Sequence, residues 1–437
     1  MIVLYLPEAP VTEVGPERSV AGLPLANRLL RASRRTGADR VIAYAPRTAP
    51  VLGREAARLG IRTLTIATSP PDWAAALETL AGDAVVTVVP AGLVVSPALL
   101  EMSRTTPPGT GDASLADVSG GDRWPRTGAY RTSVAGARDI HALAARIARR
   151  AREVVPLPTG ADIARQEAVL IARARRRSDL ASVEAAVRRA MYKPSDPVLA
   201  RFNRRLSLPI SVWLIAHTPL SANGLSLLLI VMAVAVAWAF GLGGYWSSVA
   251  GAVLSLAASI LDGCDGEIAR LKYEETSFGC WIETFGDYAY YVALFTGMTV
   301  GVVRATGQAA YAWVGLAALV GAVLTFVLLT GLRRSGTGGR PERLQLTARQ
   351  RFTSGGAAWT KVVNELVTVA TRSTMPYGIL LMTVLHALPL VLVLAALGAN
   401  TYWIAMLLRW PALRGLHAAA GPEGPALRAR PGSVRRA

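Results

Sequence analysis

The sequence is poor in cysteine, histidine, aromatic residues and charge. Among its 437 residues are 2 Cys and 4 His, and 7% are aromatic. Two cysteines build no disulfide framework, and the four scattered histidines show no metal-ligand spacing. Charged residues make up only 17%, whereas soluble domains carry about 25%, and hydrophobic residues make up 52%. We therefore expect part of the chain to lie in a lipid bilayer.

The charge that is present is mainly positive, with a net value of +18. Basic proteins commonly bind nucleic acid or anionic lipid. Aromatic side chains are not interleaved with the basic ones, as stacking in a nucleic-acid groove requires. The basic residues flank apolar runs instead, which is typical of membrane proteins. We predict a lipid bilayer as partner and no nucleic acid.

Residues 1–158 predict a soluble α/β domain. Short apolar strands alternate with helical stretches, beginning with IVLYL at 2–6, a helix over 23–35 and RVIAYA at 40–45. This alternation is typical of a mostly parallel sheet covered by helices. The first residues, MIVLYL, lack the basic start and long apolar core of a secretory signal. We expect this domain to stay in the cytosol.

Residues 159–207 predict a basic linker and an interfacial amphipathic helix. The stretch 160–192 is helical in pattern and rich in arginine. It predicts either a helix on the membrane surface or a solvated charged helix. The segment 196–216, DPVLARFNRRLSLPISVWLIA, mixes apolar and basic residues and is expected to lie in the interface.

Residues 208–410 predict an all-α six-helix transmembrane domain. A helix needs about 20 apolar residues to cross the hydrocarbon. Six stretches meet this length: 223–242, 245–262, 281–303, 309–332, 360–384 and 387–409. The sequence HALP at 386–389 predicts the turn between the last two, and residues 411–437 predict a basic disordered tail.

The basic residues also predict an orientation. The stretch 333–351 holds six arginines, whereas the loops at GLGGYW and HALP hold no Lys or Arg. With six spans, every basic loop falls on the side of the N-terminal domain, in agreement with the positive-inside rule. We expect a multi-pass protein of the cell membrane with both termini and the active site in the cytoplasm.

Four carboxylates gather between the second and third predicted spans, in DGCDGEIARLKYEETSFGCWIETFGD at 262–287. Asp262 and Asp265 share one helical face, and Glu283 and Asp287 share another. Charges at membrane depth are costly without cations or a polar cavity. All-oxygen ligands suit Mg²⁺, Mn²⁺ or Ca²⁺. The spacing alone fits an enzyme or the cation site of a transporter.

The same segment resembles the signature of the CDP-alcohol phosphotransferase family, D-x2-D-G-x2-A-R-x8-G-x3-D-x3-D. Seven of its eight fixed positions match with the correct spacing: Asp262, Asp265, Gly266, Ala269, Arg270, Gly279 and Asp287. The eighth position holds Glu283, which keeps the carboxylate but is one methylene longer. An ion site does not require the A-R-x8-G pattern, so the resemblance favours the enzyme.

The resemblance implies transfer of a phospho-alcohol from a CDP-alcohol to an acceptor hydroxyl, with release of CMP. Two Mg²⁺ or Mn²⁺ ions would be held by Asp262, Asp265, Glu283 and Asp287. Asp287, the last acid, would take the hydroxyl proton. A homodimer is also implied. The CDP-binding positions that it implies are Asp262, Gly266, Ala269, Arg270, Gly279, Asn223 and Ser226.

Some basic residues have two interpretations. Arg270 is expected to bind phosphate, and a structural ion pair with Glu267 or an aspartate is the alternative. Lys193, Arg204 and Arg372 are candidates for the phosphate of a polar acceptor, and each is equally suited to anchor the chain in the interface. The likeness of KPSD and DGCDGEIARLK to inositol-using members favours a polyol phosphate, while the family at large favours lipid alcohols.

The segment GPERSVAGLPLANRLLRASRRTGADRVIAY resembles the early part of MobA-like nucleotidyltransferases. The whole chain thus resembles bifunctional inositol-phosphate cytidylyltransferases and di-myo-inositol-phosphate-phosphate synthases. However, PEAPVTEVG stands where a Gly-rich phosphate loop belongs, and VVTVVPAGLVVSP carries no metal-binding Asp. We predict a degenerate nucleotidyltransferase-like domain. The alternative is a bifunctional enzyme that also makes the CDP-alcohol from CTP.

Overall fold

The computed structural model divides the chain into two compact units. The first comprises Met1–Asp196, Leu208–Leu220 and Glu267–Glu274, and the second comprises Pro197–Ser207, Ser221–Gly266 and Glu275–Ala437. The structure describes residues 1–7, 14–81, 84–97, 99–101, 113–117, 126–149, 153–157, 171–174, 176–192, 198–334 and 374–408.

The first unit is built on a seven-stranded sheet with the strand order β10-β8-β9-β6-β1-β4-β5. Strand β1 pairs in parallel with β4 and β6, and β4 pairs in parallel with β5. Strand β9 is antiparallel to β6 and β8, and β10 is parallel to β8. The predicted α/β unit with a mostly parallel sheet is confirmed, whereas its likeness to nucleotidyltransferases stays a prediction. The strands are β1 (Ile2–Leu6), β4 (Arg40–Tyr44), β5 (Leu64–Ala67), β6 (Val85–Pro90), β8 (Ala113–Asp117), β9 (Arg126–Ser133) and β10 (Glu153–Leu157).

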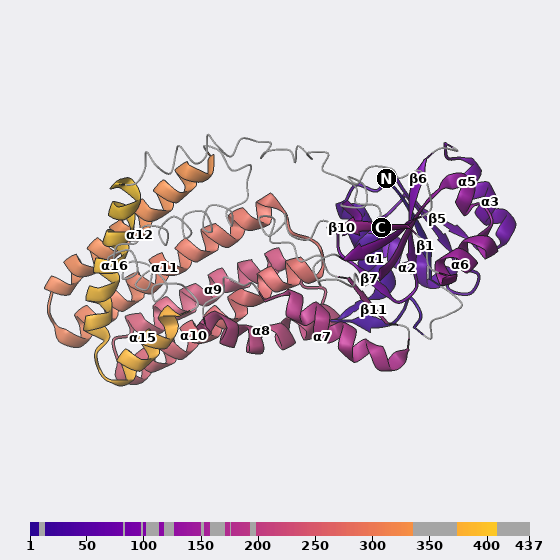
Figure 1. Cartoon of the computed structure of the whole chain (residues 1–437). Helices are drawn as coiled ribbons and strands as arrows, with labels where there is room; N and C mark the ends of the chain where they lie inside the picture. Colours follow the sequence, from indigo (N-terminus) through magenta and orange to yellow (C-terminus); the bar gives the residue numbers. More distant parts are fainter. Residues whose placement is uncertain are drawn as a thin grey trace. The chain divides into compact units, whose positions relative to one another are not determined.

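Three helices connect the parallel strands (Figure 1): α1 (Leu25–Arg35), α2 (Ala49–Leu59) and α3 (Pro70–Glu78). Local sequence signals set their ends. Gly60 ends α2 in the left-handed conformation, and Ser69 begins α3 in a reciprocal capping box with Asp72. The short helices α5 (Val134–Ala137) and α6 (Ile140–Arg149) follow β9.

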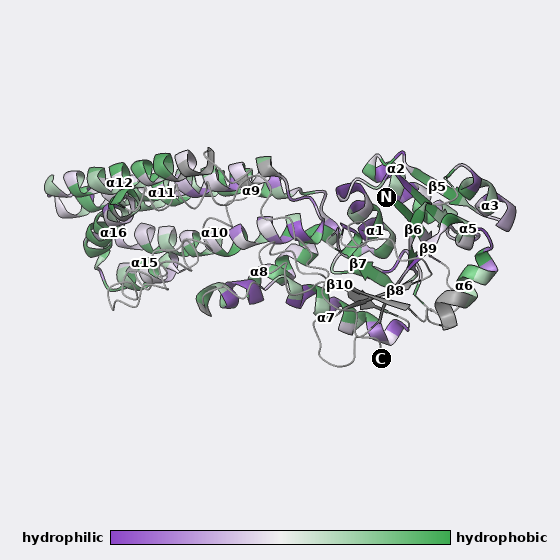
Figure 2. Cartoon of the chain, turned by 45° about the horizontal axis from the view of Figure 1, so that its top comes forward, coloured by the Kyte–Doolittle hydropathy of each residue, from purple (hydrophilic) through white to green (hydrophobic). Residues whose placement is uncertain are grey.

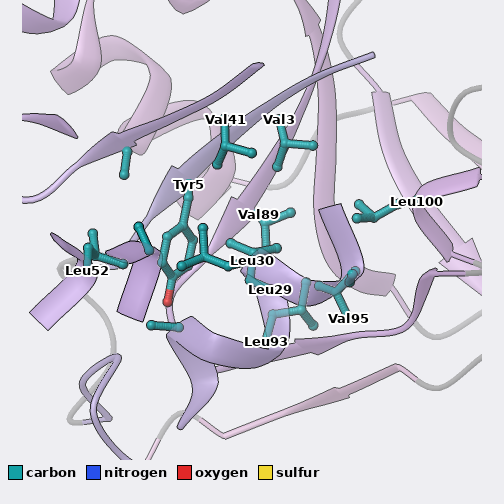
Figure 3. Close-up of a cluster of buried hydrophobic side chains, with 14 of the residues drawn as sticks. Val3, Tyr5, Leu29, Leu30, Val41, Leu52, Val89, Leu93, Val95 and Leu100 are labelled. Atoms are coloured by element: carbon teal, nitrogen blue, oxygen red, sulfur yellow. The ribbon is translucent and has the colours of Figure 1, made fainter. Parts of the chain in front are cut away.

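One of the buried clusters of this unit lies between α1 and the parallel strands (Figure 3). Leu29 and Leu30 of α1 pack with Val3 of β1 and Val89 of β6, and none of the four is more than 2% exposed. Burial of such side chains stabilises the fold by about 1.5–3 kcal/mol each. Tyr5 belongs to the same cluster, and burial raises the pKa of its hydroxyl above the usual value.

The stretch 160–192 differs in part from the single helix that we expected. Ile171–Arg173 forms a strand, β11, which pairs antiparallel with β7 (Leu93–Val95). A 3₁₀ turn at Arg177–Asp179 then leads into helix α7 (Leu180–Ala190). Backbone pairing with β7 therefore overrides the helical pattern at 171–173. The remaining short strands, β2 (Ser19–Val20) and β3 (Leu23–Pro24), pair with each other.

The helical part of the chain begins with α8 (Val198–His217), which matches the expected amphipathic helix. Helix α10 (Tyr245–Leu271) continues nine residues beyond the predicted end of its span at 262. A turn at 385–387 separates α15 from α16, as HALP predicted. The other helices are α9 (Ala222–Gly241), α10 (Tyr245–Leu271), α11 (Ser277–Thr306), α12 (Ala310–Arg334), α15 (Met375–Val384) and α16 (Leu388–Leu408).

Within the described residues, four helices are long and apolar enough to cross a membrane: α9, α10, α12 and α16. Figure 2 shows α12 and α16 mainly in the green of hydrophobic residues. Helix α11 has the length but carries Glu283, Asp287 and Arg304. Residues 360–373 of the fifth predicted span and most of the basic stretch 333–351 lie outside the described residues. The count of six spans and the orientation stay predictions.

Small residues bring the helices of the second unit close together. A Cβ atom at Gly297 or Gly301 of α11 would overlap the backbone carbonyl oxygen of Ala237 or Phe240 on α9. This spacing of four is the small-xxx-small pattern that lets membrane helices approach closely. Gly321 of α12 similarly faces α16. The close α9–α11 contact places the N-terminal end of α9 beside the first turns of α11.

Candidate active site

Helix α10 carries the first half of the acidic motif on one uninterrupted stretch. The α-helical conformation of 262–270 confirms the spacing argument, because residues three and four apart share a face. Asp265 is 4% exposed and Asp262 is half-buried. A carboxylate as buried as that of Asp265 needs polar partners to remain charged.

Asp265 has such a partner on α9. The Ser226 hydroxyl donates a hydrogen bond to Asp265 Oδ2 over 2.8 Å, and the Gly266 N–H donates to Asp265 Oδ1 over 2.5 Å. Ser226 is itself 7% exposed. Both carboxylate oxygens are therefore oriented by the protein, which is typical of functional carboxylates whose position matters.

Helix α11 carries the second half of the motif, near its N-terminal end. Thr276 caps the helix by accepting a hydrogen bond from the Gly279 N–H over 3.0 Å. A Cβ at Gly279 would lie 3.3 Å from Asn223 Oδ1. Glu283 is exposed and Asp287 is half-buried. The N-terminal turn of α9 thus supplies Asn223 beside one half of the motif and Ser226 beside the other.

A hydrogen bond between two buried hydroxyl groups joins α10 and α11 outside the acidic motif. The Ser255 hydroxyl of α10 lies 2.5 Å from the Tyr290 hydroxyl of α11. Both residues are at most 1% exposed. The sequence signal for this contact is weak, because a serine and a tyrosine inside apolar spans also occur as isolated polar residues.

Within the described residues, no three or more Asp, Glu, His or Cys side chains come together to hold a metal ion. The two pairs, Asp262 with Asp265 and Glu283 with Asp287, are each on one helix. Their convergence on shared cations therefore stays a prediction. The chemistry of the donors fits a hard divalent cation, because all four offer only oxygen atoms and Asp265 is already oriented by hydrogen bonds.

The structural ion pair considered for Arg270 is not seen among the described residues. Glu267 is fully buried and accepts a hydrogen bond from the Ser211 hydroxyl over 2.7 Å. The Nε atom of Arg270 is buried and has no hydrogen-bond partner in the described part of the chain. An arginine with an unused buried donor fits the phosphate-binding role better than the structural one.

The remaining expected residues have mixed outcomes. Arg204 lies half-buried on α8, and Lys193 and Arg372 lie outside the described residues. The same helix supplies two polar residues that sequence reasoning missed. The Ser207 backbone carbonyl accepts a hydrogen bond from the Cys264 thiol over 3.4 Å, and the Asn203 side-chain oxygen accepts one from the Tyr377 hydroxyl over 2.5 Å. Both residues are buried, and no sequence signal predicted this, because their burial depends on packing against other elements.

The part of the chain that carries the acidic motif is similar to a known protein family. Residues 219–413 match the sequence profile of the family described as CDP-alcohol phosphatidyltransferase. The matched stretch holds the whole acidic motif together with Asn223 and Ser226. This part of the chain belongs to the CDP-alcohol phosphatidyltransferase family. The predicted membership and the predicted transferase class are thus confirmed for this domain.

One curated relative has a matching segment. The "Bifunctional IPC transferase and DIPP synthase" of Aquifex aeolicus (strain VF5) is 33% identical over 114 residues. The match covers 25% of this chain and 25% of the relative. The likeness to bifunctional enzymes is therefore supported over a quarter of each protein.

Proposed function

We propose that this protein transfers the phospho-alcohol group of a CDP-alcohol to the hydroxyl of an acceptor alcohol and releases CMP. The observation that carries the proposal is the link that α9 makes between the two halves of the motif. Ser226 bonds to Asp265, and Asn223 lies against Gly279. These contacts support a single site at the N-terminal end of α9, where the family profile matches.

The donor is proposed to lie against the small residues of the motif. Gly266, Ala269 and Gly279 leave backbone accessible to a nucleotide, because none has a side chain larger than a methyl group. Arg270 would donate from its guanidinium group to a phosphate oxygen. Asn223 can donate through its amide to an oxygen of the donor.

The acceptor hydroxyl is proposed to attack the β-phosphorus of the donor. The new O–P bond forms as the bond between the β-phosphorus and the CMP oxygen breaks. Asp287 would take the hydroxyl proton, since a carboxylate within hydrogen-bond reach serves as general base. Asp262, Asp265, Glu283 and Asp287 would hold divalent cations. Such ions neutralise charge on a pyrophosphate and on the leaving oxygen.

The test is CMP release by the purified full-length protein in the presence of Mg²⁺. A panel of CDP-alcohols and acceptors, including polyol phosphates and lipid alcohols, is incubated with the enzyme and the products are identified by mass spectrometry. We expect CMP to appear in step with the new phosphodiester. Absence of CMP with every donor, combined with cation-driven uptake into proteoliposomes, would favour the transporter instead.

The name of the Aquifex relative favours a second candidate, in which the first unit supplies the donor. A bifunctional protein would convert CTP and a polyol phosphate to a CDP-alcohol and pyrophosphate. We propose a degenerate first unit, because PEAPVTEVG lacks clustered glycines and β6 carries no aspartate. The full-length protein should then release no pyrophosphate from CTP with any polyol phosphate of the panel.

A further inference from the structure

Helix α10 ends in a turn whose geometry favours glycine but contains tyrosine. Tyr273 has φ of 56°. Its N–H donates to the Arg270 carbonyl over 3.2 Å, and the Glu274 N–H donates to the Ala269 carbonyl over 2.8 Å. These two bonds form a Schellman motif, in which the left-handed residue is usually glycine. A residue with a Cβ atom is strained in the left-handed conformation, so favourable contacts elsewhere must offset this energy.

The α/β part of the first unit provides those contacts. The Tyr273 hydroxyl donates to the Val95 carbonyl over 3.1 Å. Tyr273 also packs against the buried core cluster that contains Leu29 and Val95. Figure 3 shows these two residues of the cluster. Val95 is the last residue of β7, so the tyrosine connects the end of α10 to a strand of the same unit.

Arg28 of α1 holds the same helix end. Its guanidinium group is 1% exposed and donates to the carbonyls of Val20, Ala21 and Leu271. The bond to Leu271, at 3.0 Å, satisfies one of the carbonyls that every helix leaves free at its C-terminus. A buried cation at this position also interacts favourably with the helix dipole.

A second arginine of α1 adds to the contact. Arg31 forms an ion pair with Glu274 and donates to Asn27 over 2.5 Å, and Asn27 in turn donates to Glu55 over 2.5 Å. Polar residues of α1 thus bind the end of α10 and the residues that follow it. They belong to the segment whose sequence resembles nucleotidyltransferases.

We propose that Arg28 and Tyr273 are positioning residues that fix the rotation of α10 and thereby the direction of its aspartates. Asp265 precedes Leu271 by six residues on one helix, about 9 Å along its axis. Within so short a distance, a helix end held by hydrogen bonds transmits its rotation to the residues upstream. The α/β part would then support the transfer reaction although it does not carry out chemistry.

The decisive variant is Tyr273→Gly. Glycine relieves the backbone strain and preserves the Schellman motif, but it removes the hydroxyl and the ring that connect α10 to β7. A residue that only caps the helix would tolerate this change. A positioning residue would not. Tyr273→Phe keeps the ring, and Arg28→Met removes the bond to Leu271.

Cys264 reports on α10 without relying on activity. Its side chain is fully buried one residue before Asp265. In a Cys280→Ser background, labelling by a small maleimide measures how often this stretch opens. We expect Tyr273→Gly to label about tenfold faster with an unchanged melting temperature, and Tyr273→Phe about threefold faster. Ser69→Ala, at the distant cap of α3, is the control and should label at the wild-type rate.

The measurement of CMP release rests on the proposed function. Tyr273→Gly and Arg28→Met should lower kcat for CMP release about tenfold and leave KM for the CDP-alcohol within about twofold. Wild-type labelling and kcat in Tyr273→Gly would overturn the positioning role. If the wild-type protein releases no CMP from any donor, the proposed function fails, and the labelling rates alone then decide whether the residues hold α10.

Discussion

The hydroxyl of Ser226 lies 2.8 Å from Asp265 Oδ2 and donates to it, although 39 residues separate the two in sequence. Each is at most 7% exposed. This bond connects the first turn of α9 to the acidic motif of α10 and orients a carboxylate that is expected to bind metal.

Replacing Ser226 by alanine should lower activity. The substitution removes one hydrogen-bond donor from a buried carboxylate, which costs about 1–3 kcal/mol. We expect kcat for CMP release to fall about tenfold. Thr325→Ala is the matched control, because Thr325 is also buried but its only hydrogen bond among the described residues is to the Gly321 carbonyl of its own helix. Equal activity in the two variants would contradict a role for Ser226.

Glu283 provides a matched pair of substitutions. Glu283→Gln keeps the length and removes the charge, whereas Glu283→Asp keeps the charge and restores the residue of the family signature. We expect Glu283→Gln to lower CMP release by about 100-fold and Glu283→Asp to retain most of it. Chelation with EDTA should abolish release and Mg²⁺ should restore it. Retained activity of Glu283→Gln would remove this residue from the predicted metal ligands.

Gly279→Ala should impair donor binding without loss of stability. The added Cβ would lie 3.2 Å from Thr276 Oγ1 and 3.3 Å from Asn223 Oδ1, so Asn223 must shift. We expect KM for the CDP-alcohol to rise about fivefold, which corresponds to about 1 kcal/mol. Among the described residues, Gly286→Ala on the same helix meets only Ile230, at 4.0 Å, and should leave KM unchanged. Steady-state kinetics on both variants makes the comparison.

Gly297→Ala should destabilise the second unit, because its Cβ would overlap the backbone of Ala237 on α9. Backbone cannot move aside as a flexible side chain does, and overpacking of this kind costs about 1–3 kcal/mol. Gly398→Ala on α16 meets no atom of the described residues within 4 Å and serves as control. Thermal unfolding in detergent should show a lower melting temperature only for Gly297→Ala.

Lys272 should make stability depend on pH. It is 8% exposed, its ammonium group donates to the Leu220 carbonyl over 2.8 Å, and burial lowers its pKa below the ordinary 10.5. Because the folded-state pKa is the lower one, the unfolded chain binds more protons between the two values. The free energy of unfolding should therefore rise with pH through this window, up to 10.5.

Melting temperatures of the full-length protein, followed from neutral pH to 10.5, measure this slope. Lys272→Met keeps the aliphatic bulk, has no titrating group at this position and should flatten the slope. The nearby charges of Glu274, Arg31 and Arg58 also act on the ammonium group, so the comparison is made at constant ionic strength. An identical slope in the variant would assign the pH dependence to other groups.

Much of the candidate site follows from the sequence, because a helix converts spacing into a shared face. The intervals from Asp262 to Asp265 and from Glu283 to Asp287 require no knowledge of distant contacts, and both stretches are helical as expected. Strand–helix alternation likewise predicted β1, α1 and β4, since patterning and caps are local signals.

Contacts between distant segments are not contained in such local signals. The pairing of β11 with β7 overrode a helical pattern, since ladder hydrogen bonds depend on a strand that lies far away in sequence. Tyr273 adopts a conformation that its own residue type disfavours, and one Arg28 nitrogen donates to Leu271, at the end of a helix that begins more than 200 residues later. The motif and its helices could thus be predicted from the sequence, because they depend on neighbouring residues along the chain. The residues that orient these helices could be identified only from the tertiary structure. Their stabilising contribution comes from packing and hydrogen bonds between segments that are far apart in the sequence.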